Sequence, residues 1–581
     1  ELLLVTGISR QDLSNLTSVI RIGTTTALRQ FPRRWSQDIL ARLKTTRPNQ
    51  AGYKKYNRDA FLYEKDYLTK KRGLFQGPPL GSLLKYKISD SKHWQGGLTL
   101  ENDAGEAYFT TKQPTGFDFL SSHICYTTDR LFHQIIIGDY KIQWGQGLVA
   151  WSGYSPGKST SSLSTEKSGR GITPYTSTDD NRFLRGVAIS LHPIPSMTTE
   201  FFISHKKTDG NLANPDSLAT QPSATLYETG YHRTFAECEK KHKIKDFTTG
   251  FSTLLSLRYF RIGVQLLHYN FNPNLSIGTA LHQQHNETGS HRTLLSTDYK
   301  TGIYHFYLFG EAARSDNGAW ATIHGLCYSG IPRFTLYALY RYYAKNFHSH
   351  YNGGFSEYSN TTNEEGCYFG LECIPFHAVK INVYYDRFHF FSPRYQATIP
   401  GYGQEIAGNI TFSRNAWECT FRFKHEEKPE DYKTTSLQSV TRVKQEYRLQ
   451  TTILINNAFT TRSQALYSYY AKNEKQENGY LISQDLMYSS PQLNAQFRFA
   501  YFDTDSYNTR IYTFENNVLY GYSFPALSDR GFRSYLNLNW KPISNTTIYL
   551  KSGITYYPDK YTISSGQTQI NDNKSFDITL Q

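Results

Sequence analysis

Apolar and polar residues alternate along most of this chain with a period of two. The clearest alternation lies in five segments: 334–341, 379–386, 419–424, 447–453 and 493–499. A period of two is typical of a β-strand, in which successive side chains point to opposite faces. The second face carries charged residues, as Arg422 and Lys424 do beside Phe421 and Phe423. That face is too polar for a buried core, so the pattern indicates a wall with lipid on one side and a wet lumen on the other.

Two kinds of connection separate the strands. Tight turns are expected at 329–332, 490–491 and 542–545, and long polar loops at 206–245, 272–291, 345–364, 425–441 and 522–532. Short turns at one end and long loops at the other are typical of outer-membrane barrels. The alternating runs give about 24 strands, with a range of about 18–26, which fits a single-chain barrel. The sequence therefore predicts an all-β fold, a large transmembrane antiparallel β-barrel over residues 31–581.

Composition strengthens this prediction. Aromatic residues make up 15% of the 581 residues, with 46 Tyr and 36 Phe, while the hydrophobic share is only 38%. The mean hydropathy is −0.56, and no run approaches the roughly 18–20 apolar residues that a spanning helix needs. In a membrane barrel only alternate residues face lipid, so hydropathy stays low while aromatic residues collect at the interfaces. The composition excludes a helical membrane protein and favours a barrel.

One long stretch, residues 144–186, breaks the alternation. It is dense in aromatic residues, glycines and charges of both signs, and strand-like segments lie on both sides of it. Ordinary connecting loops are shorter. We expect it to fold inward, with residues 149–183 plugging the lumen and its arginines facing its aspartates. The residues proposed for this plug loop are Trp144, Arg170, Asp179, Asp180, Arg182 and Arg185. The alternative is a disordered surface loop, because the segment 159–164 is low-complexity serine and threonine.

Residues 1–30 follow a helical pattern instead. Apolar residues recur at helical spacing after the turn Gly7, Ile8 and Ser9, which predicts two short helices around a tight turn. The segment resembles the second half of a helix-hairpin-helix unit, in which a Gly-hydrophobic-Gly turn exposes backbone amides to phosphate. Ser9 stands in place of the second glycine, which weighs against DNA binding. A small packing unit ahead of the barrel is the alternative.

The formal net charge is +14, which raises the question of nucleic-acid binding. The basic residues are spread singly between apolar neighbours, so we expect them to face the lumen and do not expect a nucleic-acid partner. Six cysteines lack metal-ligand spacing, so no metal site is predicted. One disulfide is compatible with an oxidising compartment but has no assignable pairing. The cysteines are Cys125, Cys238, Cys327, Cys367, Cys373 and Cys419.

The signals for nucleotide binding and catalysis are incomplete. The segment GYSPGKST at 153–160 resembles a phosphate-binding loop, but Ser152 stands where the motif requires its first glycine. Four histidines fall in or beside strands, and none is paired recognisably with a nucleophile: His123, His133, His192 and His205. We therefore expect no enzyme activity, no catalytic residues and no cofactor.

A family resemblance rests on three segments, 138–159, 167–190 and 229–241. Their sharpest motifs are GDY at 138–140, GQGL at 145–148, SGRG at 168–171 and NRFLRG at 181–186. With the hairpin-like residues in front, the chain resembles the Bacteroidota outer-membrane β-barrel proteins of the helix-hairpin-helix domain-containing family. The resemblance implies a Gram-negative outer-membrane location, contact with outer-membrane lipid and lipopolysaccharide, and residues 1–30 as a periplasmic segment.

Two classes of function stay open. The first is a non-enzymatic structural or accessory subunit of an envelope machine for outer-membrane protein assembly or protein secretion, with protein partners in a membrane complex. A plugged, tyrosine-rich barrel with long loops favours it. The second is a transport channel or porin for solutes. A passive porin would carry a short constriction loop, and the inward loop expected here is much longer, so the accessory hypothesis is preferred at this point.

Overall fold

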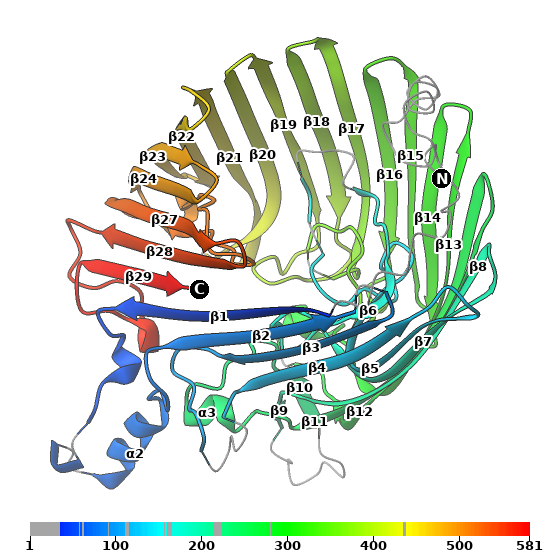
Figure 1. Cartoon of the computed structure of the whole chain (residues 1–581), viewed down its shortest axis with the longest axis horizontal. Helices are drawn as coiled ribbons and strands as arrows, with labels where there is room; N and C mark the ends of the chain where they lie inside the picture. The colour runs from blue at the N-terminus through cyan, green and yellow to red at the C-terminus, as the bar shows by residue number, and fades with distance from the viewer. Residues whose placement is uncertain are drawn as a thin grey trace.

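Twenty-four antiparallel strands form one closed barrel (Figure 1). The computed structural model describes residues 35–581 apart from 57, 61–62, 91, 111–115, 156, 160–164, 214–222, 279, 359 and 434–436. The main sheet has 27 strands, of which β6, β9 and β10 are short and do not span the wall. The barrel strands are β1 (Ser36–Arg47), β2 (Gly81–Ser89), β3 (Trp94–Asn102), β4 (Phe119–Thr127), β5 (Phe132–Gln143), β7 (Leu184–Ile194), β8 (Met197–Thr208), β11 (Ile244–Ser256), β12 (Phe260–Leu275), β13 (Gly289–Ile303), β14 (Phe306–Ser315), β15 (Trp320–Ile331), β16 (Phe334–Tyr343), β17 (Glu364–Phe376), β18 (Val379–His389), β19 (Tyr402–Arg414), β20 (Trp417–Lys433), β21 (Leu437–Leu454), β22 (Phe459–Lys472), β23 (Lys475–Ser489), β24 (Leu493–Thr504), β27 (Gly531–Ile543), β28 (Thr546–Tyr556) and β29 (Lys574–Leu580).

Short elements lie in the connections between these strands. The short strands are β6 (Gly171–Pro174), β9 (Gly210–Leu212), β10 (Ser223–Leu226), β25 (Ile511–Tyr512) and β26 (Ala526–Leu527), and the helices are α2 (Glu64–Arg72) and α3 (Phe235–Cys238). Single 3-10 turns lie at Ala51–Tyr53, Arg58–Ala60, Leu281–Gln283, Tyr507–Thr509 and Gly566–Thr568. In the described part of the chain, no helix is long and apolar enough to cross a membrane.

The barrel closes between its first and last strands. One edge of β1 pairs with β2, and the other pairs with β29, with Leu43 opposite Leu580 and Arg47 opposite Phe576. All other wall strands pair with their neighbours in sequence order. Closure leaves no strand edge exposed, which lipid requires because the hydrocarbon core offers no partner for a free N–H or C=O group. The predicted fold class is thus confirmed, including a strand count near 24.

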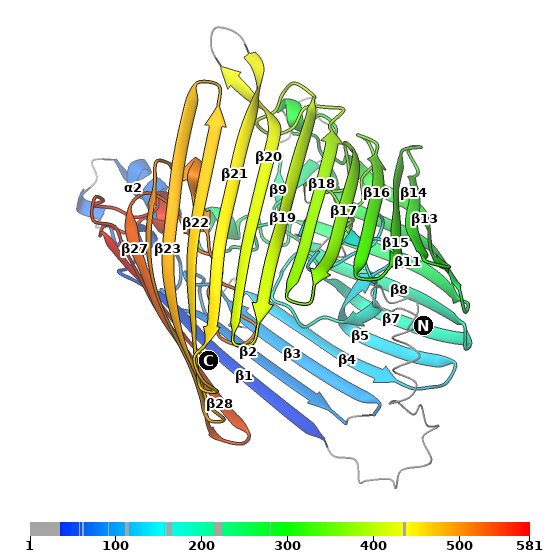
Figure 2. The same cartoon turned by 90° about the horizontal axis from the view of Figure 1, so that it is seen from above.

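The two ends of the barrel differ in their connections (Figure 2). At one end, turns of two residues join β7 to β8, β13 to β14, β17 to β18 and β27 to β28. At the other end lie the long connections 103–118, 144–183, 209–243, 344–363 and 505–530. Short turns on one side and long loops on the other are as predicted. The loop predicted at 425–441 is wrong, because β20 and β21 continue through most of it.

The outer face of the wall is apolar and aromatic. Phe421 and Phe497 are 39% and 44% exposed and stand opposite Ile410 and Leu486 on neighbouring strands. Exposed aromatic side chains gather next to the short turns: Trp94, Phe132, Phe306, Trp417, Phe459 and Trp540. An apolar band edged by aromatic residues is the surface that a barrel presents to a bilayer. The helical hairpin predicted for residues 1–30 lies outside the described residues.

All six cysteines are free thiols. They are distributed over β4, α3, β15, β17 and β20. The disulfide that an oxidising compartment would allow is therefore not formed.

Candidate functional site: the lumen and its inward loops

The stretch 144–183 leaves the wall at the end of β5 and runs inside the ring of strands (Figure 1). Next to the point where this stretch leaves the wall, Gly138 on β5 faces Gly186 on β7. Their φ angles are 105° and 154°. A Cβ on either glycine would come within 2.2 Å of a carbonyl oxygen on the next strand. Only glycine allows the backbones to approach this closely. Beyond this point β5 pairs with the inner strand β6.

A buried carboxylate on the wall holds the first turn of the inward loop. Glu311 on β14 is 1% exposed, and one of its oxygens accepts the backbone N–H of Gln146 at 2.6 Å and that of Leu148 at 3.2 Å. Gly145 has a φ of 53°, and a Cβ there would lie 2.7 Å from Glu311. The carboxylate thus satisfies two backbone donors that would otherwise be buried without a partner.

A second wall carboxylate joins the two ends of the inward loop. Glu200 on β8 accepts the indole N–H of Trp144 at 2.6 Å and the backbone N–H of Ile172 in β6 at 3.0 Å. A Cβ on Gly171 would lie 2.3 Å from the same carboxylate. Glycine at this position therefore lets the chain reach Glu200.

Charged pairs hold the far part of the inward loop. Lys158 pairs with Glu357 and with Asp386 on β18, and its side chain is only 9% exposed. Glu166 accepts from Lys300 on β13 at 2.5 Å and from the Tyr307 hydroxyl at 2.7 Å. Ion pairs shielded from bulk water hold a segment more firmly than exposed ones.

A second loop, residues 344–363, folds in against the first. Gly353 donates to the carbonyl of Gly147 at 2.9 Å, Trp151 donates to the carbonyl of Tyr351 at 2.5 Å, and Ser349 donates to that of Val149 at 2.6 Å. Both loops contribute to one buried apolar cluster with the wall, in which the loop members are Trp144, Leu148, Val149, Ala150, Ile172, Phe347, Tyr351 and Phe355. The sequence marked 345–364 only as a long polar loop, so its inward path was missed.

The predicted pairing of arginines with aspartates inside the loop does not occur. Arg185 binds Asp139 on β5 instead, with Nε to Oδ1 at 2.6 Å, because the register sets these two residues opposite each other. Asp179 caps a turn by accepting the backbone N–H groups of Asn181 and Arg182. Arg170 is exposed and Arg182 half-buried, and neither forms an ion pair with a carboxylate that the structure describes. Trp144 is buried, and its indole N–H donates to Glu200.

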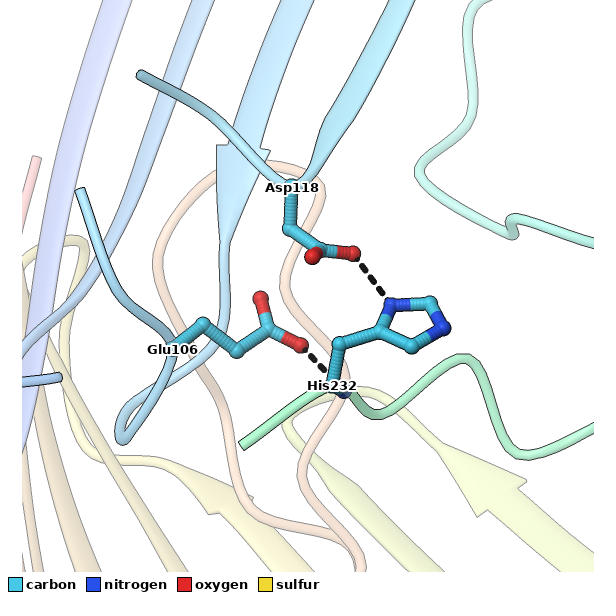
Figure 3. Close-up of side chains that lie close together, drawn as sticks. All are labelled: Glu106, Asp118 and His232. Atoms are coloured by element: carbon cyan, nitrogen blue, oxygen red, sulfur yellow. Dashed lines mark hydrogen bonds and ion pairs between the residues drawn. The ribbon is translucent and has the colours of Figure 1, made fainter. Parts of the chain in front are cut away.

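A polar cluster at the long-loop rim ties two connections together, 103–118 and 209–243 (Figure 3). His232 bonds Asp118 through Nδ1 at 2.6 Å and Asp209 through Nε2 at 2.7 Å. Its backbone N–H donates to Glu106 at 2.9 Å. Atoms of Glu106, Asp118 and His232 lie within 4.8 Å of one another, a spacing that suits a cation. Each of these atoms already takes part in a hydrogen bond, so the cluster is a polar lock between loops.

Burial and charge shift the titration of this lock. Burial alone would lower the pKa of His232, but its bonds to Asp118 and Asp209 outweigh burial and raise the pKa to about 9. Burial, reinforced by the charge of Asp118, raises the pKa of Glu106 to about 8. Burial and the same charge raise the pKa of Asp180 to about 8. At neutral pH the lock therefore holds a charged histidine between two carboxylates, next to two protonated acids.

We expect the lock to loosen at alkaline pH. A raised pKa means that the contribution of His232 is complete below its ordinary pKa of about 6.5 and is lost as pH rises through about 9. The buried Glu106, whose pKa is raised from 4.5 to about 8, also weakens the lock as pH rises towards 8, where this loss is complete. Amide hydrogen exchange should show protection of the His232 N–H falling about tenfold or more between pH 7 and 9 after correction for intrinsic rates. The control is the Trp94 amide, which donates to Asp90 at the other end and should keep its protection. Equal protection of His232 at pH 7 and 9 would contradict this assignment.

Two neighbouring cavities that share lining residues lie in the lumen beside the inward loops, on the side of β20 and β21. The larger, of about 620 Å³, opens among the long loops and is lined by residues such as Lys345, Arg394 and Lys428. The smaller, of about 360 Å³, lies deeper against β20, β21 and the Lys158 region of the inward loop. Lys424, Glu446 and Arg510 line both. These two cavities leave space in the lumen on the side of β20 and β21.

A closed 24-stranded antiparallel barrel with an apolar outer band and a polar, loop-filled lumen is a transmembrane barrel of the outer-membrane type. No family model matches the chain. No curated protein matches it either.

Several solved structures are similar at low identity. The copper transporter OprC is similar over 94% of this chain and 80% of its own, at 8% identity and a TM-score of 0.45. A ferric enterobactin receptor from Pseudomonas aeruginosa is similar over the same shares, at 8% identity and a TM-score of 0.41. OmpT of Vibrio cholerae is similar over 67% of this chain and 98% of its own, at 8% identity and a TM-score of 0.27. These likenesses are too weak to indicate what this chain binds. The family resemblance stays a prediction, and the comparisons support neither a helix-hairpin-helix family nor a role in assembly or secretion.

Proposed function

We propose that the protein is a transport barrel for solutes, whose lumen is closed at rest by its own two inward loops. The observation that carries this proposal is the way in which the loops are held. Wall carboxylates accept backbone and indole N–H groups of the first inward loop, lysine–carboxylate pairs hold its far part, and the second loop packs against the first. Water can replace such polar contacts one by one, so their release does not require the wall to unfold.

The position of the charged cavities favours transport over the accessory hypothesis. Both cavities lie inside the barrel, and charged side chains line them. A subunit that serves only to dock protein partners would need its binding residues on the rim or the outer face of the barrel. The accessory role in an envelope machine stays a prediction.

Weakening the two carboxylate anchors tests the proposal. In the double variant Glu200→Ala/Glu311→Ala, Trp144, Gln146, Leu148 and Ile172 lose acceptors, and an unpaired buried donor costs about 1–3 kcal/mol. We expect bursts of ion conductance in planar bilayers, where the unaltered protein is mostly closed.

The matched control is Glu372→Ala, which removes a wall carboxylate that pairs with Lys380 at 3.1 Å and contacts neither inward loop. It should behave like the unaltered protein. A double variant that stays closed, or unaltered protein that is already open, would contradict the proposal.

A further inference from the structure

The smaller lumen cavity carries positive charge that no carboxylate balances. Five cationic side chains line it, together with one carboxylate: Lys158, Arg422, Lys424, Arg448, Arg510 and Glu446. Lys158 and Lys424 have their own partners, Glu357 and Asp386 for the first and Glu405 and Glu426 for the second. Glu446 faces Lys444 at 2.8 Å. Within the described part of the chain, the three arginines have no carboxylate at ion-pair distance.

Neutral groups hold two of these arginines in place. Arg448 donates to the carbonyl of Tyr512 at 3.0 Å. Arg510 donates to the hydroxyl of the same tyrosine at 2.9 Å and to the carbonyl of Tyr507 at 2.7 Å. These bonds position the guanidinium groups and leave their charge uncompensated. The arrangement is that of a preorganised set of donors around an empty volume.

The register of β20 and β21 shows where a charge of opposite sign is missing. On the lumen face of β20 and β21, Lys424 stands opposite Glu446 and Glu426 opposite Lys444, so two successive pairs have opposite charges. The next pair is Arg422 opposite Arg448. Like charges directly across a strand pair are destabilising, and local violations of this kind are expected at functional sites. A bound anion would turn this repulsion into attraction.

We infer that this cavity is a binding site for a small, multiply charged oxyanion, and therefore that the transported solutes include anions that carry phosphate or carboxylate groups. This inference rests on the proposed transport function. Guanidinium forks match the oxygen geometry of these groups in a bidentate manner, and 360 Å³ is the size of a small-molecule site. Because the wider cavity shares Arg510 and Lys424 with it, the site is continuous with the volume that opens among the long loops.

Calorimetric titration of the intact, detergent-solubilised barrel with pyrophosphate tests the inference. At about 0.1 M salt, which screens exposed charges, we expect saturable binding of one pyrophosphate per chain. Arg422→Gln and Arg448→Gln should each weaken it about tenfold or more, because each removes a charge-assisted bond. Arg448→Lys keeps the charge but not the fork, and should weaken binding less than Arg448→Gln. Arg462→Gln is the matched control, since Arg462 lies on the same wall but does not line the cavity.

Thermal unfolding of the same variants separates binding from structure. Arg422→Gln relieves the repulsion, so without ligand it should unfold at the same or a higher temperature than the unaltered protein. Pyrophosphate should stabilise the unaltered protein more than this variant. No binding, equal binding by all variants, equal loss in Arg462→Gln, or a destabilised ligand-free Arg422→Gln would overturn the inference. Binding is measured at equilibrium on the closed protein, so its failure is distinct from failure of the conductance tests.

Discussion

A barrel in which residues 154–176 are replaced by a short glycine–serine linker is expected to conduct ions, about tenfold or more above the unaltered protein. The replacement removes Lys158, Glu166 and β6, and with them the pairs to Asp386 and Lys300. It leaves the β5–β7 pairing intact, so the wall should still close. Barrels of 16–18 strands already enclose an aqueous channel, and one of 24 strands is wider unless something fills it.

The control for this deletion is a linker replacement at the same end of the barrel that does not touch the lumen loops. Residues 558–568 are mostly exposed and connect β28 to β29, so their replacement should leave the conductance low. Both barrels should migrate as folded species without boiling. If the deleted barrel is folded and stays closed, the inward loop is not what closes the lumen.

The second large effect is expected on the lipid face. Phe421→Arg should impair assembly by about 2–4 kcal/mol if the side chain lies near the middle of the bilayer. Phe421 stands between Ile410 and Leu449 on the neighbouring strands, so a guanidinium there has an apolar residue directly across on either side. The fraction that reaches the heat-modifiable, folded form in outer membranes measures the effect. Phe497→Arg, flanked by Leu486 and Leu536, should behave in the same way.

The residue after Phe421 provides the control for which face of β20 points to lipid. Arg422 points to the cavity, and Arg422→Ala should assemble nearly as well as the unaltered chain. Equal impairment by Phe421→Arg and Arg422→Ala would mean that the assigned outer and inner faces are wrong.

The strands were predictable because a two-sided wall imposes a two-residue period, which even single segments such as 493–499 display. The segment 425–441 was misassigned as a loop because both of its faces are polar. Its charges pair across β20 and β21, as Arg442 does with Glu426 at the lumen, and a register of this kind is not visible in a single segment. The available signal in the sequence was that charges of opposite sign in the two segments would face each other if the segments paired as strands.

The candidate site was predictable in outline and not in its contacts. Length, glycines and aromatic residues indicated that 144–186 folds inward, and Trp144 is buried there. The partners came from elsewhere: Glu200 and Glu311 occupy ordinary lumen-facing positions of their strands, which nothing in the sequence separates from other wall carboxylates. Arg185 pairs with Asp139 because the register of β5 and β7 sets them opposite each other, a fact of pairing rather than of composition.

The most direct test of this account is a cryo-electron microscopy map of the unaltered protein in lipid nanodiscs. We expect density for residues 144–155 inside the barrel, with the Glu311 carboxylate beneath the amides of Gln146 and Leu148 and with the 344–363 loop against it. A map in which the lumen is empty and this stretch lies above the rim would contradict it.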